Sequence, residues 1–209
     1  TKLKKIKFSA NATSLGSMSI PACIESVTLP KKIEVIDSRT FKDCKKLRNV
    51  KLPSSLNAIY AKAFEGCTGL KEISLPKKLE LLDSSAFSGC KSLKKVDLPK
   101  GIKKIGANPF SGCDKLSKIT LDKSNKRYKV VGNTLFDKYL KRIVLYIPNN
   151  KKTTYTVPSN VKEIGKDAFK GNKNLKTIKM SDSVTSVGAC AFAETTKLRN
   201  VKLSNKITV

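Results

Sequence analysis

The sequence predicts a β-solenoid, in which one short supersecondary unit stacks on copies of itself. Phenylalanine recurs every 23 residues through the first half of the chain and returns in the same setting near its end, at Phe41, Phe64, Phe87, Phe110, Phe169 and Phe192. A leucine lies six positions after each of them, at Leu47, Leu70, Leu93, Leu116, Leu175 and Leu198. A period of this length is typical of repeat arrays, whose units bury their apolar side chains only against their neighbours.

Each unit contains one clear strand pattern. Val50 and Leu52 flank a lysine, which is the alternation of a strand with one buried face, and Pro53 ends it because proline lacks the N–H that a ladder needs. Leu56 and Ile59 lie three apart, which favours an irregular bend or a turn of 3₁₀ helix. We therefore expect a right-handed coil of short parallel β-strands with irregular or 3₁₀ returns and low helix content.

Four of the six cysteines keep the same phase, three positions after a phenylalanine, at Cys44, Cys67, Cys90 and Cys113. Stacking places them in a ladder with rungs about 5 Å apart. Parallel side chains in register give poor disulfide torsions, so we predict buried, reduced thiols that behave as small apolar groups. Cys23 and Cys190 fall outside the ladder and are expected to be more exposed.

The order of the units divides the chain, which we expect to form a single domain over residues 1–209. Residues 1–23 form a degenerate first repeat or cap, and residues 24–121 form regular repeats. Residues 122–158 break the period, and regular repeats resume over 159–209.

The irregular segment predicts two β-hairpins. Residues 130–136 have the pattern of a tight hairpin. Strands are also expected at 140–145 and 155–157. Their matching apolar positions lie only twelve residues apart, which is too few for a full coil. We therefore expect a second hairpin with its loop at 148–152. Such an insertion often marks a functional face of a repeat array, and an insertion without any role in binding is the equal alternative.

The pattern L-x-x-[IV]-x-L-P-x-x-[LI]-x-x-I-x-x-x-A-F-x-x-C runs through residues 47–67, 70–90 and 93–113, with Leu82 in place of its isoleucine and Pro109 in place of its alanine. It resembles the leucine-rich repeat of the BspA type, also called the Treponema pallidum type, in which proline follows the strand. The resemblance implies a leucine-rich-repeat solenoid. It also implies a secreted or cell-surface protein that adheres to host or neighbouring-cell macromolecules.

The charge of the chain is strongly positive. Lysine and arginine number 43 against 16 acidic residues, a formal net charge of +27. This excess suggests an anionic partner such as a glycosaminoglycan, a cell-wall polymer, a membrane surface or nucleic acid. Since 38 of the cations are lysine and bidentate phosphate recognition favours arginine, nucleic acid is the least favoured of these. A generally lysine-rich, solvated surface is the alternative explanation.

The sequence offers little for catalysis. It contains no histidine, which removes the commonest general base and histidine metal sites. A single row of cysteines cannot surround a zinc ion, and no phosphate-binding glycine loop is present. We expect a non-enzymatic protein without metal or cofactor. No apolar run of about 20 residues predicts membrane insertion. Without an initial Met or signal peptide, an exported protein would appear here as a processed or trimmed piece.

The candidate binding site is a basic row on the outer face of the strands. Its members follow the first leucine of a repeat or lie between the two buried strand positions: Arg48, Lys51, Lys71, Lys94, Lys176, Lys179, Arg199 and Lys202. Stacked at about 5 Å per repeat, their like charges repel, and an anionic ligand would relieve the repulsion. Repetition of a lysine-rich unit would produce the same row without a function.

Three functions therefore remain open. The first is adhesion to an extracellular protein or glycan. The second is binding of an anionic polymer by the basic row, and the third is a structural spacer within a larger surface protein.

Overall fold

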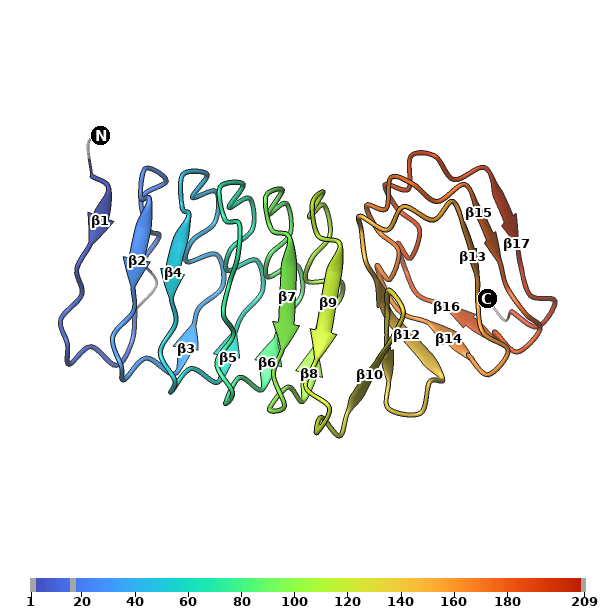
Figure 1. Ribbon diagram of the computed structural model, residues 1–209, viewed down its shortest axis with the longest axis horizontal. Helices are drawn as coiled ribbons and strands as arrows, with labels where there is room; N and C mark the ends of the chain where they lie inside the picture. Colours follow the sequence, from blue (N-terminus) through green and yellow to red (C-terminus); the bar gives the residue numbers. More distant parts are fainter. Residues whose placement is uncertain (1–2, 16–17, 208–209) are drawn as a thin grey trace.

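The computed structural model describes residues 3–15 and 18–207 and confirms the solenoid (Figure 1). The coil makes about nine turns with parallel strands, and the described residues contain no helix. The outermost residues of the expected domain, 1–2 and 208–209, lie outside the described part, as do residues 16–17 of the expected cap.

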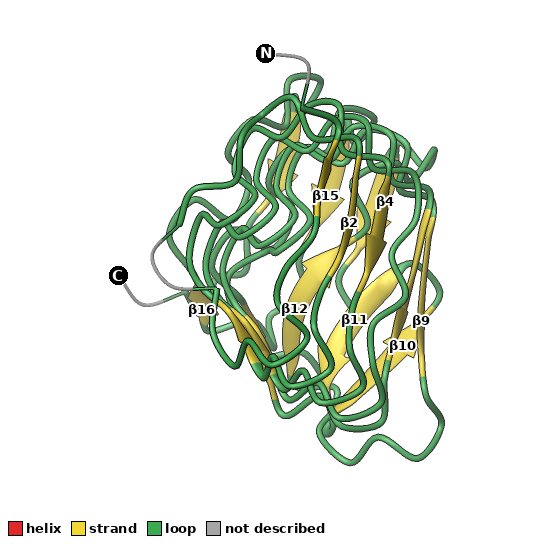
Figure 2. Ribbon diagram, turned by 90° about the vertical axis from the view of Figure 1, so that its left-hand side faces the viewer, coloured by secondary structure: helices red, strands yellow, loops and turns green. Residues whose placement is uncertain are grey.

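A first column of strands stacks along the coil, as Figure 2 shows from one end. Its members are β1 (Lys5–Ile6), β2 (Ser26–Thr28), β4 (Asn49–Lys51), β7 (Lys95–Leu98), β9 (Lys118–Leu121), β13 (Thr154–Thr156), β15 (Thr177–Lys179) and β17 (Asn200–Lys202). Parallel pairing joins them into three sheets, β1-β2-β4, β7-β9 and β13-β15-β17. These strands occupy the positions at which the sequence alternates apolar and polar residues.

A second column of strands runs beside the first, where the sequence predicted a bend. It contains β3 (Val35–Ile36), β5 (Ala58–Ile59), β6 (Leu81–Leu82), β8 (Lys104–Ile105), β14 (Glu163–Ile164) and β16 (Ser186–Val187). Each strand has only two residues, too few to show a period of two in the sequence. The neighbouring coils supply the pairing partners, so the strand character arises from stacking.

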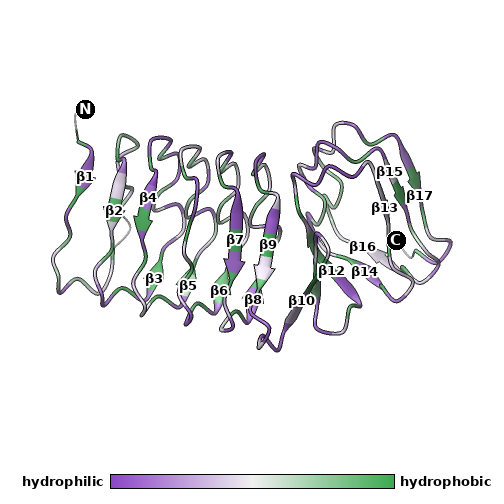
Figure 3. Ribbon diagram, viewed as in Figure 1, coloured by the Kyte–Doolittle hydropathy of each residue, from purple (hydrophilic) through white to green (hydrophobic). Residues whose placement is uncertain are grey.

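The phenylalanine side chains form a continuous rung inside the first half of the coil. The ring centroids of Phe41 and Phe64, and of Phe64 and Phe87, lie 4.9 Å apart, and Phe110 continues the stack at 5.8 Å. All four are fully buried. Figure 3 shows apolar segments recurring at the same place in successive coils. The 23-residue period of the sequence is therefore the period of the core.

The cysteine ladder is buried and reduced, as predicted. The Cys67 thiol donates a 3.1 Å hydrogen bond to the main-chain carbonyl of Phe41 in the preceding coil, and Cys90 repeats the bond to Phe64 at 3.2 Å. A thiol is a weak donor, and here it adds a second hydrogen bond to a carbonyl that already accepts one from a main-chain N–H in its own turn. Outside the ladder, Cys190 is exposed and Cys23 is half-buried.

Residues 128–146 form a three-stranded antiparallel meander. β10 (Tyr128–Val131) and β11 (Thr134–Asp137) pair through a tight turn, with Val131 opposite Thr134, which confirms the first predicted hairpin. β11 then pairs antiparallel with β12 (Arg142–Tyr146).

The second predicted hairpin is wrong. β12 pairs parallel with β14, and β13 pairs parallel with β15 in a different sheet. The spacing from Leu140 to Ile143 is that of Leu56 to Ile59, so it belongs to the second column rather than the first. The twelve residues from Ile143 to Tyr155 therefore connect the two columns within one coil.

The meander separates two apolar cores. Leu135, Leu145 and Ile147 pack into the core of the preceding coils, which we call the N-terminal block (residues 3–121). Phe136 and Tyr146 pack into the core of the following coils, the C-terminal block (residues 154–207). Because β11 and β12 bury side chains on both faces, the meander is a partition that both blocks need.

Candidate functional site

The structure places all eight residues of the predicted basic row on the surface. It brings Arg48, Lys71 and Lys94 together along one edge of the first column, where they line a shallow hollow of about 410 Å³. The backbone fixes part of this stacking, since the Lys94 N–H donates to the Lys71 carbonyl at 3.2 Å. We call these three residues the N-terminal basic cluster.

The basic row falls into two groups of residues. In the C-terminal block, the Arg199 N–H donates to the Lys176 carbonyl at 3.0 Å, and Lys179 lies opposite Lys202. Ser117 occupies the row position after the N-terminal basic cluster. β9 and β13 belong to different sheets, so the two groups of cations are separated by the irregular part of the chain.

An acidic residue interrupts the positive surface of the first column. Lys95 pairs with Asp97 at 2.8 Å, and the Thr120 hydroxyl also donates to Asp97. These hydrogen bonds, led by that of Lys95, hold the pKa of the Asp97 carboxyl below its usual range. The strand face around β7 is therefore of mixed charge, and Lys51 stands apart from it between Thr28 and Ser74.

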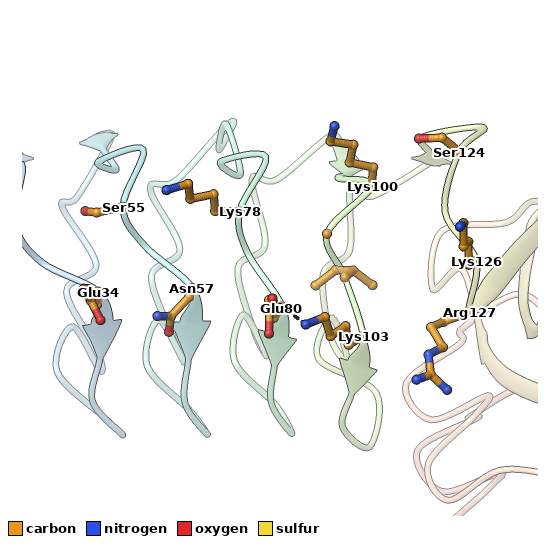
Figure 4. A pocket seen from close by; sticks show the side chains of 12 residues that line it. Glu34, Ser55, Asn57, Lys78, Glu80, Lys100, Lys103, Ser124, Lys126 and Arg127 are labelled. Atoms are coloured by element: carbon orange, nitrogen blue, oxygen red, sulfur yellow. Dashed lines mark ion pairs between the residues drawn. The ribbon is translucent and has the colours of Figure 1, made fainter.

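A larger groove lies beside the second column, and the sequence reasoning missed it. It has a volume of about 780 Å³ and extends along successive coils from Glu34 to Arg127. Figure 4 shows side chains of both charges along it, with Glu80 and Lys103 in an ion pair of 2.6 Å. The available signal was the polar residue before each second-column strand, which recurs at the repeat period at Glu34, Asn57, Glu80 and Lys103.

A third depression, which we call the junction hollow, lies where the second column of the N-terminal block meets the meander. It has a volume of about 530 Å³, and its charged lining residues are Lys103, Lys104, Arg127, Asp137, Arg142 and Lys166. A neighbouring hollow of about 380 Å³ shares Arg127 and Asp137 with it and includes Lys138 and Tyr139. Sequence reasoning missed this cluster because its members do not all share one position of the repeat.

Tyr128 shapes the wall of the junction hollow. Its hydroxyl accepts a 3.0 Å hydrogen bond from the Ile105 N–H, which points away from the preceding coil and has no strand to pair with. Burial raises the pKa of Tyr128 above its ordinary value. The second column of the N-terminal block therefore ends at β8 against a neutral phenol.

The thiols of the buried cysteine ladder are not available as nucleophiles. Burial raises the pKa of Cys44 to about 12, and burial likewise raises that of Cys90, so these thiols stay protonated and are poor nucleophiles. Among the described residues, no three His, Cys, Asp or Glu side chains are grouped to hold a metal ion. The same part of the chain has no helix long and apolar enough to cross a membrane.

Stacked parallel strands, phenylalanine rungs and a reduced cysteine ladder define a leucine-rich-repeat solenoid, a class of binding scaffold. The family model described as "BspA type Leucine rich repeat region" matches six copies over residues 1–67, 21–141 and 146–209. The chain therefore belongs to the BspA-type leucine-rich-repeat family. A search of curated protein sequences found no significant match.

Solved structures share the fold. The pneumococcal vaccine antigen PcpA is 26% identical with a TM-score of 0.70, over 88% of this chain and 52% of that one. A leucine-rich cell surface protein of Faecalibacterium prausnitzii is 27% identical with a TM-score of 0.62, over 88% and 43%. The chain thus spans about half the length of these two proteins. The T. pallidum leucine-rich repeat protein, 22% identical with a TM-score of 0.56 over 95% and 79%, supports the fold alone.

Proposed function

We propose that this protein is a non-enzymatic binding scaffold, secreted or held at a bacterial cell surface, that adheres to an extracellular protein or glycan of a host or neighbouring cell. The observation that carries the proposal is the exposed edge of the first column, where Arg48, Lys71 and Lys94 share one hollow on a rigid array. Membership of the BspA-type repeat family and the similarity to a leucine-rich cell surface protein of F. prausnitzii support the location.

Rigidity is the physical reason for placing the site there. The residues of the first column are positioned by backbone pairing and by a core of stacked rings, so a ligand binds without ordering the surface first. We propose that residues 1–209 act as one such domain, with 122–158 serving as its internal partition.

The test immobilises the folded protein and measures capture of purified extracellular-matrix proteins and cell-surface glycans at physiological salt. Replacement of Arg48, Lys71 and Lys94 by Glu should abolish capture. Replacement of Lys91, Lys151 and Lys197 by Glu, at exposed positions outside the basic row, changes the net charge equally and is the matched control. If the unaltered protein retains no extracellular ligand, adhesion is excluded and the role of a spacer is favoured.

A second candidate is binding of an anionic polymer by the same N-terminal basic cluster. It is favoured by the net charge of +27 and by the absence, among the described residues, of an ion pair to Arg48, Lys71 or Lys94. Polymer affinity should then fall steeply with salt through counterion release. An unchanged salt slope after the Glu substitutions would contradict this candidate.

A further inference from the structure

We propose that the junction hollow is a second binding site, specific for an anionic oligosaccharide. Arg127, Lys104 and Lys166 hold a sulfate or carboxylate group, and the adjoining Tyr139 ring receives a sugar ring. This site is separate from the strand face and rests on the proposed function only in that the protein is a binding scaffold.

The first step of the argument is convergence. Lys104 belongs to β8 in the N-terminal block, Arg127 precedes β10, and Lys166 follows β14 in the C-terminal part of the second column. All three side chains are exposed, and all three line the same hollow. Figure 4 shows Arg127 beyond the last regular coil, at the end of the groove beside the second column. Three cations from three coils therefore meet where the regular stacking stops.

The second step is the balance of charge inside the hollow. Lys103 is already paired with Glu80 at 2.6 Å, and Arg142 with Glu163 at 3.0 Å. Within the described part of the chain, Arg127, Lys104 and Lys166 have no such ion pair.

Asp137 is the acidic group that lines the hollow. One of its oxygens accepts hydrogen bonds from the Lys141 and Arg142 N–H groups at 2.7 and 2.8 Å. This carboxylate is therefore engaged with the backbone, and the hollow keeps an excess of positive charge. A concave site of one sign with partly apolar walls, here Ile105 and Val144, concentrates an opposite charge.

The third step is the shape of the ligand. The junction hollow and its neighbour have volumes of about 530 and 380 Å³, each within the usual range for small-ligand sites. Tyr139 is 71% exposed, and the Lys138 ammonium lies 5.4 Å from its ring centroid. A large exposed ring beside cations offers one flat apolar face and nearby charge. This combination suits a sugar that carries an anionic group.

The same geometry argues against single-stranded nucleic acid. Proteins that bind such strands stack successive bases on several aromatic side chains. Among the described residues, two aromatic side chains line these hollows. Most of the Tyr139 side chain is exposed, whereas Tyr128 is half-buried and its hydroxyl accepts a hydrogen bond from the Ile105 N–H. One exposed ring supports one planar group.

The experiment measures binding of a heparin-derived tetrasaccharide by calorimetry at about 150 mM salt, where exposed charges are screened beyond roughly 8 Å. The test variant changes Arg127, Lys104 and Lys166 to Gln. Its control changes Lys91, Lys151 and Lys197 to Gln, an equal loss of charge at exposed positions outside both candidate sites. Thermal unfolding verifies that each variant is folded, which the exposure of all six residues leads us to expect.

The expected result is a loss of affinity of about tenfold or more in the junction variant and less than about twofold in the control. Tyr139→Ala should weaken binding of the tetrasaccharide several-fold. It should not change the concentration of inorganic sulfate that displaces the tetrasaccharide. Equal losses in both triple variants, no binding by the unaltered protein, or tighter binding of a single-stranded oligonucleotide would each overturn the proposal. The junction variant should still capture the strand-face ligand, so failure here is distinguishable from failure of the proposed function.

Discussion

The side-chain amide of Asn108 donates a 2.9 Å hydrogen bond to the main-chain carbonyl of Asp167, 59 residues further along the chain. A regular array would place an intervening coil between them. In the coil that contains Tyr146, the connection between β12 and the stacked aromatic rings is shorter than the equivalent connection in the regular coils. Lys173 and Asp114 also pair across the same boundary at 2.7 Å. The two blocks are therefore joined directly at this edge.

We expect Asn108→Ala to lower the free energy of unfolding by about 1–3 kcal/mol, because it removes the amide hydrogen bonds to the main-chain carbonyls of Asp167 and Lys170. Asn108 is 1% exposed and also accepts a hydrogen bond from the Phe110 N–H. Urea titration measures the change. Asn49→Ala, at an exposed strand position, is the control and should change stability by less than about 0.5 kcal/mol. Equal effects of the two substitutions would contradict a role for the contact.

Phe87→Ala should destabilise the protein by about 3–5 kcal/mol, because the ring is fully buried between two stacked neighbours. Phe192 is partly exposed and contacts the Phe169 ring at 5.4 Å, so Phe192→Ala should cost markedly less. Chemical denaturation of both variants gives the comparison. A larger loss of unfolding free energy in Phe192→Ala would show that the stability contributed by a ring does not depend on how deeply it is buried.

The cysteines should differ sharply in reactivity. Cys190 is exposed, whereas Cys44 is buried and its pKa is raised to about 12. Since the thiolate is the reactive form, iodoacetamide at pH 8 should modify Cys190 first and the ladder only after unfolding. Mass spectrometry of the modified peptides measures this order. In Cys190→Ser the fast modification should disappear, and fast modification of a ladder cysteine would contradict the structure.

Alkaline solution should destabilise the fold through Tyr146. Burial raises the pKa of this phenol from 10.0 to about 12. The folded state therefore holds the proton more tightly than the unfolded state. Its contribution to stability is present below pH 10 and is lost as the pH rises from 10 through about 12.

The matched variant is Tyr146→Phe, with unfolding free energy measured as a function of pH. Within the described residues, the Tyr146 hydroxyl makes no hydrogen bond of ordinary geometry. Burial causes the larger rise in the pKa of Tyr146, and the nearby Asn150 side chain lowers this pKa slightly. The substitution should therefore change stability at pH 7 by less than about 1 kcal/mol. It should reduce the loss above pH 10, and part of the loss should remain because burial also raises the pKa of Tyr155. An unchanged pH profile would contradict the assignment.

The regular half of the molecule was predictable because one period governs both sequence and core. Phe64 and Cys67 repeat at the spacing of the coil, so their stacking and the reduced state of the ladder follow from the sequence. The second column was not predictable, because a two-residue strand such as Ala58–Ile59 shows no alternation of its own. The pattern from Leu140 to Leu145 fits either column, and the wrong choice produced the erroneous second hairpin.

For the candidate sites, the sequence placed Arg48, Lys71 and Lys94 on one edge because residues one period apart stack. It could not show that Lys104, Arg127 and Lys166 line one hollow.

The sequence by itself determined the repeat unit, its buried positions and the family, since these depend on interactions that recur at one spacing. Only the tertiary structure decided which strands the meander joins, how it connects the two blocks and which cations meet there. The physical reason is that contacts across the interruption, such as Asn108 with Asp167, occur once and follow no period.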